Sequence, residues 1–263
     1  MPPTWLTLIA WIWLGISFVS SGVILFDIFV RGHRQPMGVM DAVYPITALY
    51  LGALALAFYW RWARSPGRTS GGVGIDQMAA VPEMATVSAG PGTPGRDDLD
   101  AELEDLMRPT APAKPRWVTL ATEVSHCGAG CSLGDLIAEW TIYALALTVA
   151  GQALFAEYIG DFGLALGLGI VFQYFAIAPM RGLGLKDGLK AAARADFISL
   201  TAFEIGLFGW MALMAFVFFP APHHLMPNTA AYWFLMQIGM SVGFATSWPA
   251  NVWLLNRGIK VAM

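Results

Sequence analysis

Apolar runs of about 20 residues recur along this chain, and they constrain its fold more than any other feature. A run of that length can cross the ~30 Å hydrocarbon core of a bilayer as an α-helix. Membrane β-strands alternate in polarity, whereas these runs are continuous, so helices are expected. Only 13% of the residues are charged, against ~25% in a typical soluble domain. We therefore predict an all-α, polytopic transmembrane helical bundle.

Six spans are predicted from these runs. They are Trp5–Val30, Asp41–Trp62, Leu133–Phe155, Phe162–Met180, Phe197–Phe219 and Ala230–Leu255. The first run has no Lys or Arg before Arg31, so it lacks the basic start of a signal peptide and is predicted to remain as a helix. Ala156–Asp161 is predicted to be a tight acidic turn, and Leu185–Ala195 a basic helix at the membrane interface.

Residues 63–116 have a different composition, because they are rich in Pro and Gly and contain the acidic run RDDLDAELED. Such a segment cannot bury enough apolar surface to offset its chain entropy, so we predict a disordered linker. The linker separates an N-terminal two-helix membrane segment, residues 1–62, from a four-helix membrane domain, residues 117–263.

The distribution of basic residues predicts the orientation in the membrane. Six spans place both termini on one side, and most Lys and Arg residues lie at that side, so both termini are predicted to be cytoplasmic. Arg31 and Arg34 are the exception. In this topology the motif SHCGAGC, residues 125–131, lies at the cytoplasmic start of the third span, where its thiols stay reduced.

The SHCGAGC motif contains both cysteines of the chain and begins the most informative pattern of polar residues. Cys127, Cys131, Asp135 and Glu139 recur every four residues, and His126 adds an imidazole. Two thiolates and an imidazole suit Cu(I) or Zn²⁺. The glycines leave it open whether the helix is continuous through the motif. If it is not, Ser132 is a candidate N-cap for a helix that starts after it. The alternative is a glycine-rich helix start with two small buried cysteines.

Glu139 and Glu204 are carboxyl groups inside predicted spans. An unpaired carboxylate in the membrane costs ~2.5–3.5 kcal/mol on insertion scales, so each should face the bundle interior. Together they could form a proton or metal site, or alternatively a structural polar clamp between helices.

Methionines and histidines form a third candidate set. Met236 and Met240 lie one turn apart on the sixth span, and His223, His224 and Met226 lie in the loop before it. Thioether and imidazole ligands favour Cu(I), so these residues could mark a path and its external mouth. Methionine is also a common gap-filler in helical cores.

Small residues at four-residue spacing predict close helix packing. The pairs are Gly163 with Gly167 and Gly239 with Gly243.

The part of the chain from about residue 117 onward resembles the bacterial membrane-protein family DUF4396, a domain of unknown function. The strings that carry the resemblance are SHCGAGCSLGDLIAEW, FQYFAIAPMRGLGLKDGLKAAARAD, SLTAFEIGLFGWMALM and YWFLMQIGMSVGFATSWPANVWLLNRGIK. The resemblance implies a multi-pass protein of the bacterial inner membrane and transfers no catalytic residue.

Three functional hypotheses follow from these residues. The first is binding or transport of a soft transition metal, copper first and zinc second. The second is a membrane thiol oxidoreductase that uses Cys127 and Cys131, and the third is a scaffold or assembly factor of a membrane complex. The bilayer is the expected partner, and a net charge of −3 predicts no nucleic-acid partner.

Overall fold

The computed structural model describes residues 2–65, 115–181 and 184–260. The predicted linker, residues 63–116, falls outside the described residues except at its two ends. The described residues form α1 (Thr4–Phe29), α2 (Met40–Leu51), α3 (Ala53–Phe58), η1 (Tyr59–Ala63), α5 (Arg116–Leu145), α6 (Ala153–Arg181), α7 (Leu185–Leu213), η3 (Met214–Phe218) and α8 (Ala230–Asn256). The π-turns η1 and η3 continue α3 and α7. The described residues contain no β-strand, which confirms the all-α prediction.

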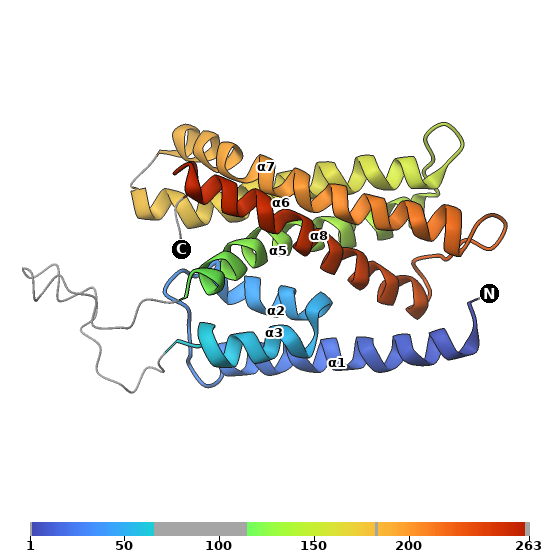
Figure 1. Cartoon of the computed structure of the whole chain (residues 1–263), viewed down its shortest axis with the longest axis horizontal. Coiled ribbons are helices and arrows are strands. Elements are labelled where there is room, and N and C mark those ends of the chain that lie inside the picture. Colours follow the sequence, from blue (N-terminus) through green and yellow to red (C-terminus); the bar gives the residue numbers. More distant parts are fainter. Residues whose placement is uncertain (1, 66–114, 182–183, 261–263) are drawn as a thin grey trace, which may run out of the picture. The chain divides into compact units, whose positions relative to one another are not determined.

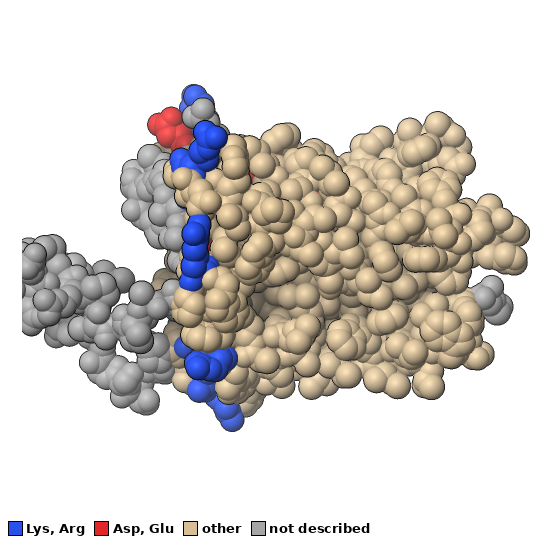
Figure 2. Space-filling model, in the orientation of Figure 1, with Lys and Arg blue, Asp and Glu red and all other residues tan. Residues whose placement is uncertain are grey.

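The surface of the bundle is that of a membrane protein. Three helical stretches are long and apolar enough to cross a bilayer, namely Thr4–Phe29, Ala153–Phe175 and Asp196–Phe218. Large apolar side chains lie on the outside, among them Trp11, 65% exposed, and Leu54, 69% exposed. Figure 2 shows that Lys and Arg gather at one end, which we call the basic end, while the rest of the visible face is uncharged. The predicted transmembrane bundle is therefore confirmed.

The predicted second span, residues 41–62, is a helical hairpin rather than one straight helix. It breaks at Gly52, whose φ of 56° favours glycine, and α3 turns back along α2. The turn before α2 contacts the residues that follow η1. His33 Nδ1 lies 2.9 Å from the carbonyl oxygen of Ser65, and the Ser65 hydroxyl donates to the Arg34 carbonyl at 2.6 Å. The hairpin thus begins and ends at the basic end (Figure 1).

The hairpin changes the predicted placement of the termini. Because α2 and α3 return to the end from which they start, α1 begins and α8 ends at opposite ends of the bundle (Figure 1). The prediction that both termini share one side differs from this arrangement. The hairpin also places the turn containing Arg31 and Arg34 at the basic end, which removes the exception noted in the charge distribution.

The turn between α5 and α6 lies earlier than predicted. Residues 146–152 form the connection, with positive φ at Ala146 (49°), Ala150 (50°) and Gly151 (76°). The predicted turn Ala156–Asp161 is part of α6 instead. The predicted interfacial helix Leu185–Ala195 is likewise the first part of α7.

The SHCGAGC motif lies in the middle of α5, which is continuous from Arg116 to Leu145. Ser132 is buried within this helix and does not cap it. The motif's glycines have a packing role. A Cβ on Gly130 would lie 2.9 Å from the Cα of Gly169, and one on Gly134 would lie 2.5 Å from the nitrogen of Ala165. Two small-residue pairs therefore let the backbones of α5 and α6 meet.

The predicted small-residue pairs have opposite outcomes. Gly239 and Gly243 are confirmed, because a Cβ on Gly243 would lie 2.8 Å from the carbonyl oxygen of Phe203 on α7. Gly163 and Gly167 have no atom within 4 Å of an added Cβ, so they take no part in close packing. Ala165 and Gly169 on the same helix, α6, take that role instead.

Candidate functional site

A column of ionisable side chains runs along the buried face of α5. Glu123, Cys127, Cys131, Asp135 and Glu139 follow one another at four-residue intervals, and each is 0% exposed. The column is about 24 Å long, because an α-helix rises about 1.5 Å per residue. Other helices and the C-terminal segment add carboxyl groups and one amine to it. We call the whole set the buried line: Glu123, Cys127, Cys131, Asp135, Glu139, Asp161, Asp196, Glu204 and Lys260.

At the basic end the line is closed by Lys260. A turn at Gly258, with φ of 64°, follows α8 and brings Lys260 into the bundle. Its Nζ lies 3.4 Å from Oε2 of Glu123 and 3.9 Å from Oδ1 of Asp196, and it donates to Asn251 Oδ1 at 3.1 Å. Burial lowers the pKa of Lys260, but Glu123 and Asp196 outweigh it, so the pKa is raised above its usual value. The amine is therefore a buried positive charge.

The two thiols lie next along the line. Cys127 is adjacent to Asp196 and Cys131, while Cys131 is adjacent to Glu204 on α7. Neither cysteine forms a disulfide bond, and both are buried. The Tyr50 side chain, at the end of α2, reaches the same region. The helical hairpin thus contacts the middle of the line.

Beyond the thiols, the line continues as a cluster of carboxyl groups from three helices. Glu139 accepts a hydrogen bond from the hydroxyl of Tyr232 on α8 and lies beside Asp161 on α6. Asp135 lies close enough to Glu204 and Glu139 to interact with them electrostatically. In each of Asp135, Asp161 and Glu204, neither carboxyl oxygen has a hydrogen-bond partner among the described residues.

At the end opposite Lys260, a pocket of about 450 Å³ opens toward the loop that precedes α8. Its polar and sulfur-containing lining consists of Thr148, Gln152, Glu157, Met211, Met214, His224, Met226, Tyr232 and Met236. Tyr232 lines the pocket and also donates to Glu139, so it connects the pocket with the carboxyl cluster. Glu157 also lines the pocket and lies close enough to Glu139 to interact with it electrostatically, so two side chains join the pocket lining to the carboxyl cluster.

The structure separates some of the predicted site residues. Glu139 lies eight residues from Cys131, about 12 Å along the helix, which is too far for one ion to contact both. Glu204 lies beside Cys131 rather than forming a pair with Glu139. His126 is buried with its ring 6.2 Å from that of Phe172, and neither ring nitrogen has a hydrogen-bond partner in the described part of the chain.

The methionines and loop histidines are divided between pocket and core. Met236 and His224 line the pocket with Met226, whereas Met240 packs in the hydrophobic core and His223 lies exposed on the loop. Among the described residues, no group of three or more His, Cys, Asp or Glu is arranged to hold a metal ion.

Sequence reasoning missed four members of the buried line. Glu123 continues the four-residue spacing and was detectable, but the helix was predicted to start ten residues later. Asp161 was assigned to a turn. Asp196 and Lys260 carry no signal in the sequence, because their place in the line depends on how α7 and the C-terminal segment pack.

Comparison with known proteins identifies a family for this chain. No curated protein and no solved structure matches the chain. The family model "Domain of unknown function (DUF4396)" matches residues 116–260. The match begins at the first residue of α5 and ends at Lys260, so it contains the whole buried line and leaves α1 to η1 outside. Because it covers more than half of the 263 residues, the chain belongs to the DUF4396 family.

Proposed function

We propose that this membrane protein binds a cation inside the bundle and passes it along the buried line. The charge balance of the line carries the proposal. The line holds six buried carboxyl groups and one buried amine. The Lys260 amine pairs with Glu123 and Asp196. The other four carboxyl groups of the line lie apart from this amine; they are Asp135, Glu139, Asp161 and Glu204. A buried carboxylate without a counter-charge is costly, so this cluster takes up protons or a cation.

We propose a soft transition metal as the cargo, copper first and zinc second. Sulfur donors lie on both sides of the carboxyl cluster. Met211, Met214 and Met236 line the pocket at one side, and Cys127 and Cys131 lie at the other. Thioether and thiolate ligands select Cu(I), and thiolates also bind Zn²⁺. His224 and Met226 at the pocket would receive the ion first.

Burial disfavours the thiol oxidoreductase hypothesis. A redox-active thiol has to meet its substrate, and such cysteines are normally at least partly exposed. Cys127 and Cys131 are both 0% exposed inside the bundle. No feature of the described residues favours the scaffold hypothesis over cation binding.

The first test measures metal in the full chain, purified in detergent under reducing conditions and incubated with copper or zinc alone. We expect stoichiometric copper in the wild type. The double variant Cys127→Ser/Cys131→Ser should bind at least about tenfold more weakly, the loss caused by removing even an outer-shell partner of a metal ligand. Asp187→Asn, which removes an exposed carboxylate on α7, is the matched control and should bind normally.

The second test measures flux into proteoliposomes. Asp135→Asn and Glu204→Gln should abolish copper uptake, because they remove carboxyl groups from the cluster. A wild type that holds neither metal overturns the soft-metal proposal. If the same two variants then abolish proton uptake, the cation of the line is the proton. If they change no flux, cation transport itself is refuted.

A further inference from the structure

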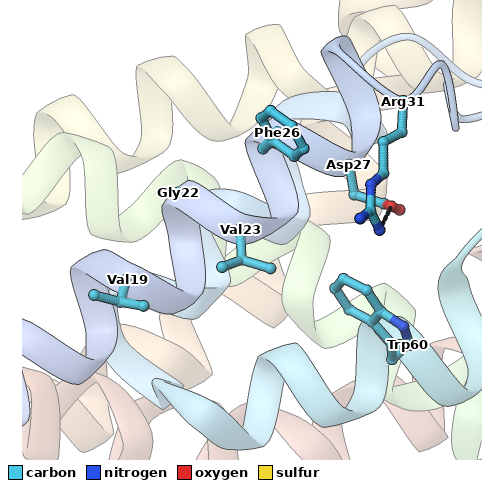
Figure 3. Close-up of a pocket in the computed structure, with 7 residues that line it drawn as sticks. All are labelled: Val19, Gly22, Val23, Phe26, Asp27, Arg31 and Trp60. Atoms are coloured by element: carbon cyan, nitrogen blue, oxygen red, sulfur yellow. Dashed lines mark ion pairs between the residues drawn. The ribbon is translucent and has the colours of Figure 1, made fainter.

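A groove on the lipid-facing side of α1 lies apart from the buried line. It has a volume of about 510 Å³. Val19, Gly22, Val23 and Phe26 form its wall on α1, and Trp60 of η1 lies across from them (Figure 3). Asp27 and Arg31 lie at the end of this row, where α1 reaches the basic end of the molecule.

The α1 sequence accounts for the shape of the groove. Residues 19, 22, 23 and 26 have the spacing of one helix face, so their side chains form a continuous apolar strip. Val19 is 66% exposed and Phe26 is 52% exposed, and both face the region of the bilayer core. Gly22 gives the strip its depth, because nothing lies within 4 Å of a Cβ added there. The strip runs about 10 Å along α1, so it can hold part of a hydrocarbon chain.

The charges at the end of the groove do not cancel. Asp27 accepts two hydrogen bonds from Arg64, both of 2.8 Å, and one from the Tyr59 hydroxyl at 3.0 Å. Arg31 lies farther away, 3.7 Å from Asp27 Oδ1, and its side chain is 56% exposed. Because Arg64 already balances Asp27, the Arg31 guanidinium is a surplus positive charge at the mouth of an apolar groove.

We infer that this groove binds an anionic phospholipid. One acyl chain lies along Val19, Gly22 and Phe26 and against Trp60, and the phosphate group pairs with Arg31. Position supports this occupant, since interfacial arginine and tryptophan mark the level of lipid head groups. Arg34 belongs to the same turn but is held by Asp41 at 2.8 Å, so it provides a control for general positive charge.

The experiment uses the full chain in bilayer nanodiscs of phosphatidylcholine. Either phosphatidylglycerol or phosphatidylcholine with brominated acyl chains is added, at the same mole fraction in both cases. The quenching of Trp60 fluorescence is the difference between the quenching measured in the wild type and in Trp60→Phe. We expect phosphatidylglycerol to be preferred about fivefold, the factor that one arginine near a head-group charge supplies. Arg31→Gln should remove the preference, and Arg34→Gln should keep it.

A second pair of variants tests the acyl-chain groove. Gly22→Leu adds a side chain to the floor of the groove, where a Cβ meets nothing within 4 Å, and should reduce quenching by both lipids. Gly15→Leu, at another open and exposed glycine of α1, should not. Thermal unfolding verifies that all variants fold. Equal quenching by both lipids in the wild type would show ordinary bulk lipid at α1, and an equal loss in Arg34→Gln and Arg31→Gln would show a diffuse charge effect. Either result overturns the inference.

Discussion

Lys260 determines the charge of one end of the buried line. Its amine is surrounded by Glu123, Asp196 and Asn251 and is 0% exposed as a side chain. Breaking a buried ion pair by removing one partner is strongly destabilising, because the other charge stays buried without compensation. The contact of Lys260 with α5 and α7 therefore matters for stability as well as for charge.

We predict that Lys260→Met lowers the free energy of unfolding by about 3–5 kcal/mol, the cost of breaking a buried ion pair. Thermal unfolding in detergent measures the change. Lys186→Met, at an exposed lysine of α7, is the control and should leave stability nearly unchanged. If both variants unfold at the wild-type temperature, Lys260 contributes no net stabilisation through its charge.

The pH dependence of this contribution follows from the raised pKa of Lys260. The folded protein holds the proton more tightly than the unfolded chain, so the stabilisation is complete below about pH 10.4, the usual lysine pKa. It is lost as the pH rises through the higher folded value. Wild-type stability should therefore fall more steeply in that range than stability of Lys260→Met. Parallel curves would contradict the assignment.

Residue spacing predicted part of the buried line but not its neighbours. The four-residue period of Cys127, Cys131, Asp135 and Glu139 indicated one helix face, and the structure places all four there. The partners Asp161, Asp196 and Lys260 come from other segments, and their approach depends on tertiary packing. A single sequence records periodicity within a helix and does not record which helices meet.

At the scale of elements, the glycines of α5 set its distance from α6. Gly130 and Gly134 lie against Gly169 and Ala165, with too little space for a methyl group at either glycine. Because α5 carries the column of ionisable residues, this contact also fixes how close Asp161 on α6 comes to Asp135 and Glu139. The glycines of SHCGAGC are thus explained by helix packing, whatever the function of its thiols.

We predict that Gly134→Ala destabilises the bundle, by about 1–3 kcal/mol as for other overpacked sites. The added Cβ would be 2.5 Å from backbone of α6, which cannot move aside as a side chain can. Gly163→Ala is the matched control, because that glycine faces open space and alanine favours the helix. Equal unfolding temperatures for the two variants would show that α5 and α6 separate without cost.

Two elements were mispredicted for the same physical reason. The hairpin break at Gly52 lies within an apolar run long enough to span a membrane, so length alone favoured one helix. The connection 146–152 is built on Ala146 and Ala150 with positive φ, residues that give no turn signal. In both places the apolar run continues across the break, so the length of the run does not show where the chain turns.

At the scale of the whole molecule, the basic end predicts the orientation in the membrane. Lys and Arg gather at the end where the hairpin starts and α8 ends. Positive residues flank spans on the cytoplasmic side, so this end should be cytoplasmic. The start of α1 and the loop before α8 lie at the other end, and the 450 Å³ pocket opens there.

We predict that an impermeant maleimide added to intact cells labels Thr4→Cys and Asn228→Cys but not Lys186→Cys. The three positions are exposed, and the native cysteines are buried, so they contribute little background. Permeabilised cells, in which all three variants should react, provide the control. Labelling of Lys186→Cys alone in intact cells would invert the orientation, and failure of Thr4→Cys alone would show that α1 starts on the cytoplasmic side.

The position of Lys260 makes the buried line electrically asymmetric. A cation arriving from the pocket meets Glu157, Tyr232 and then carboxyl groups, whereas one arriving from the basic end first meets a fixed amine of like charge. The amine is tethered to α8 by a short turn, so it cannot leave with the ion. A cation current along this line should therefore rectify, with inward movement from the pocket easier than movement in the reverse direction.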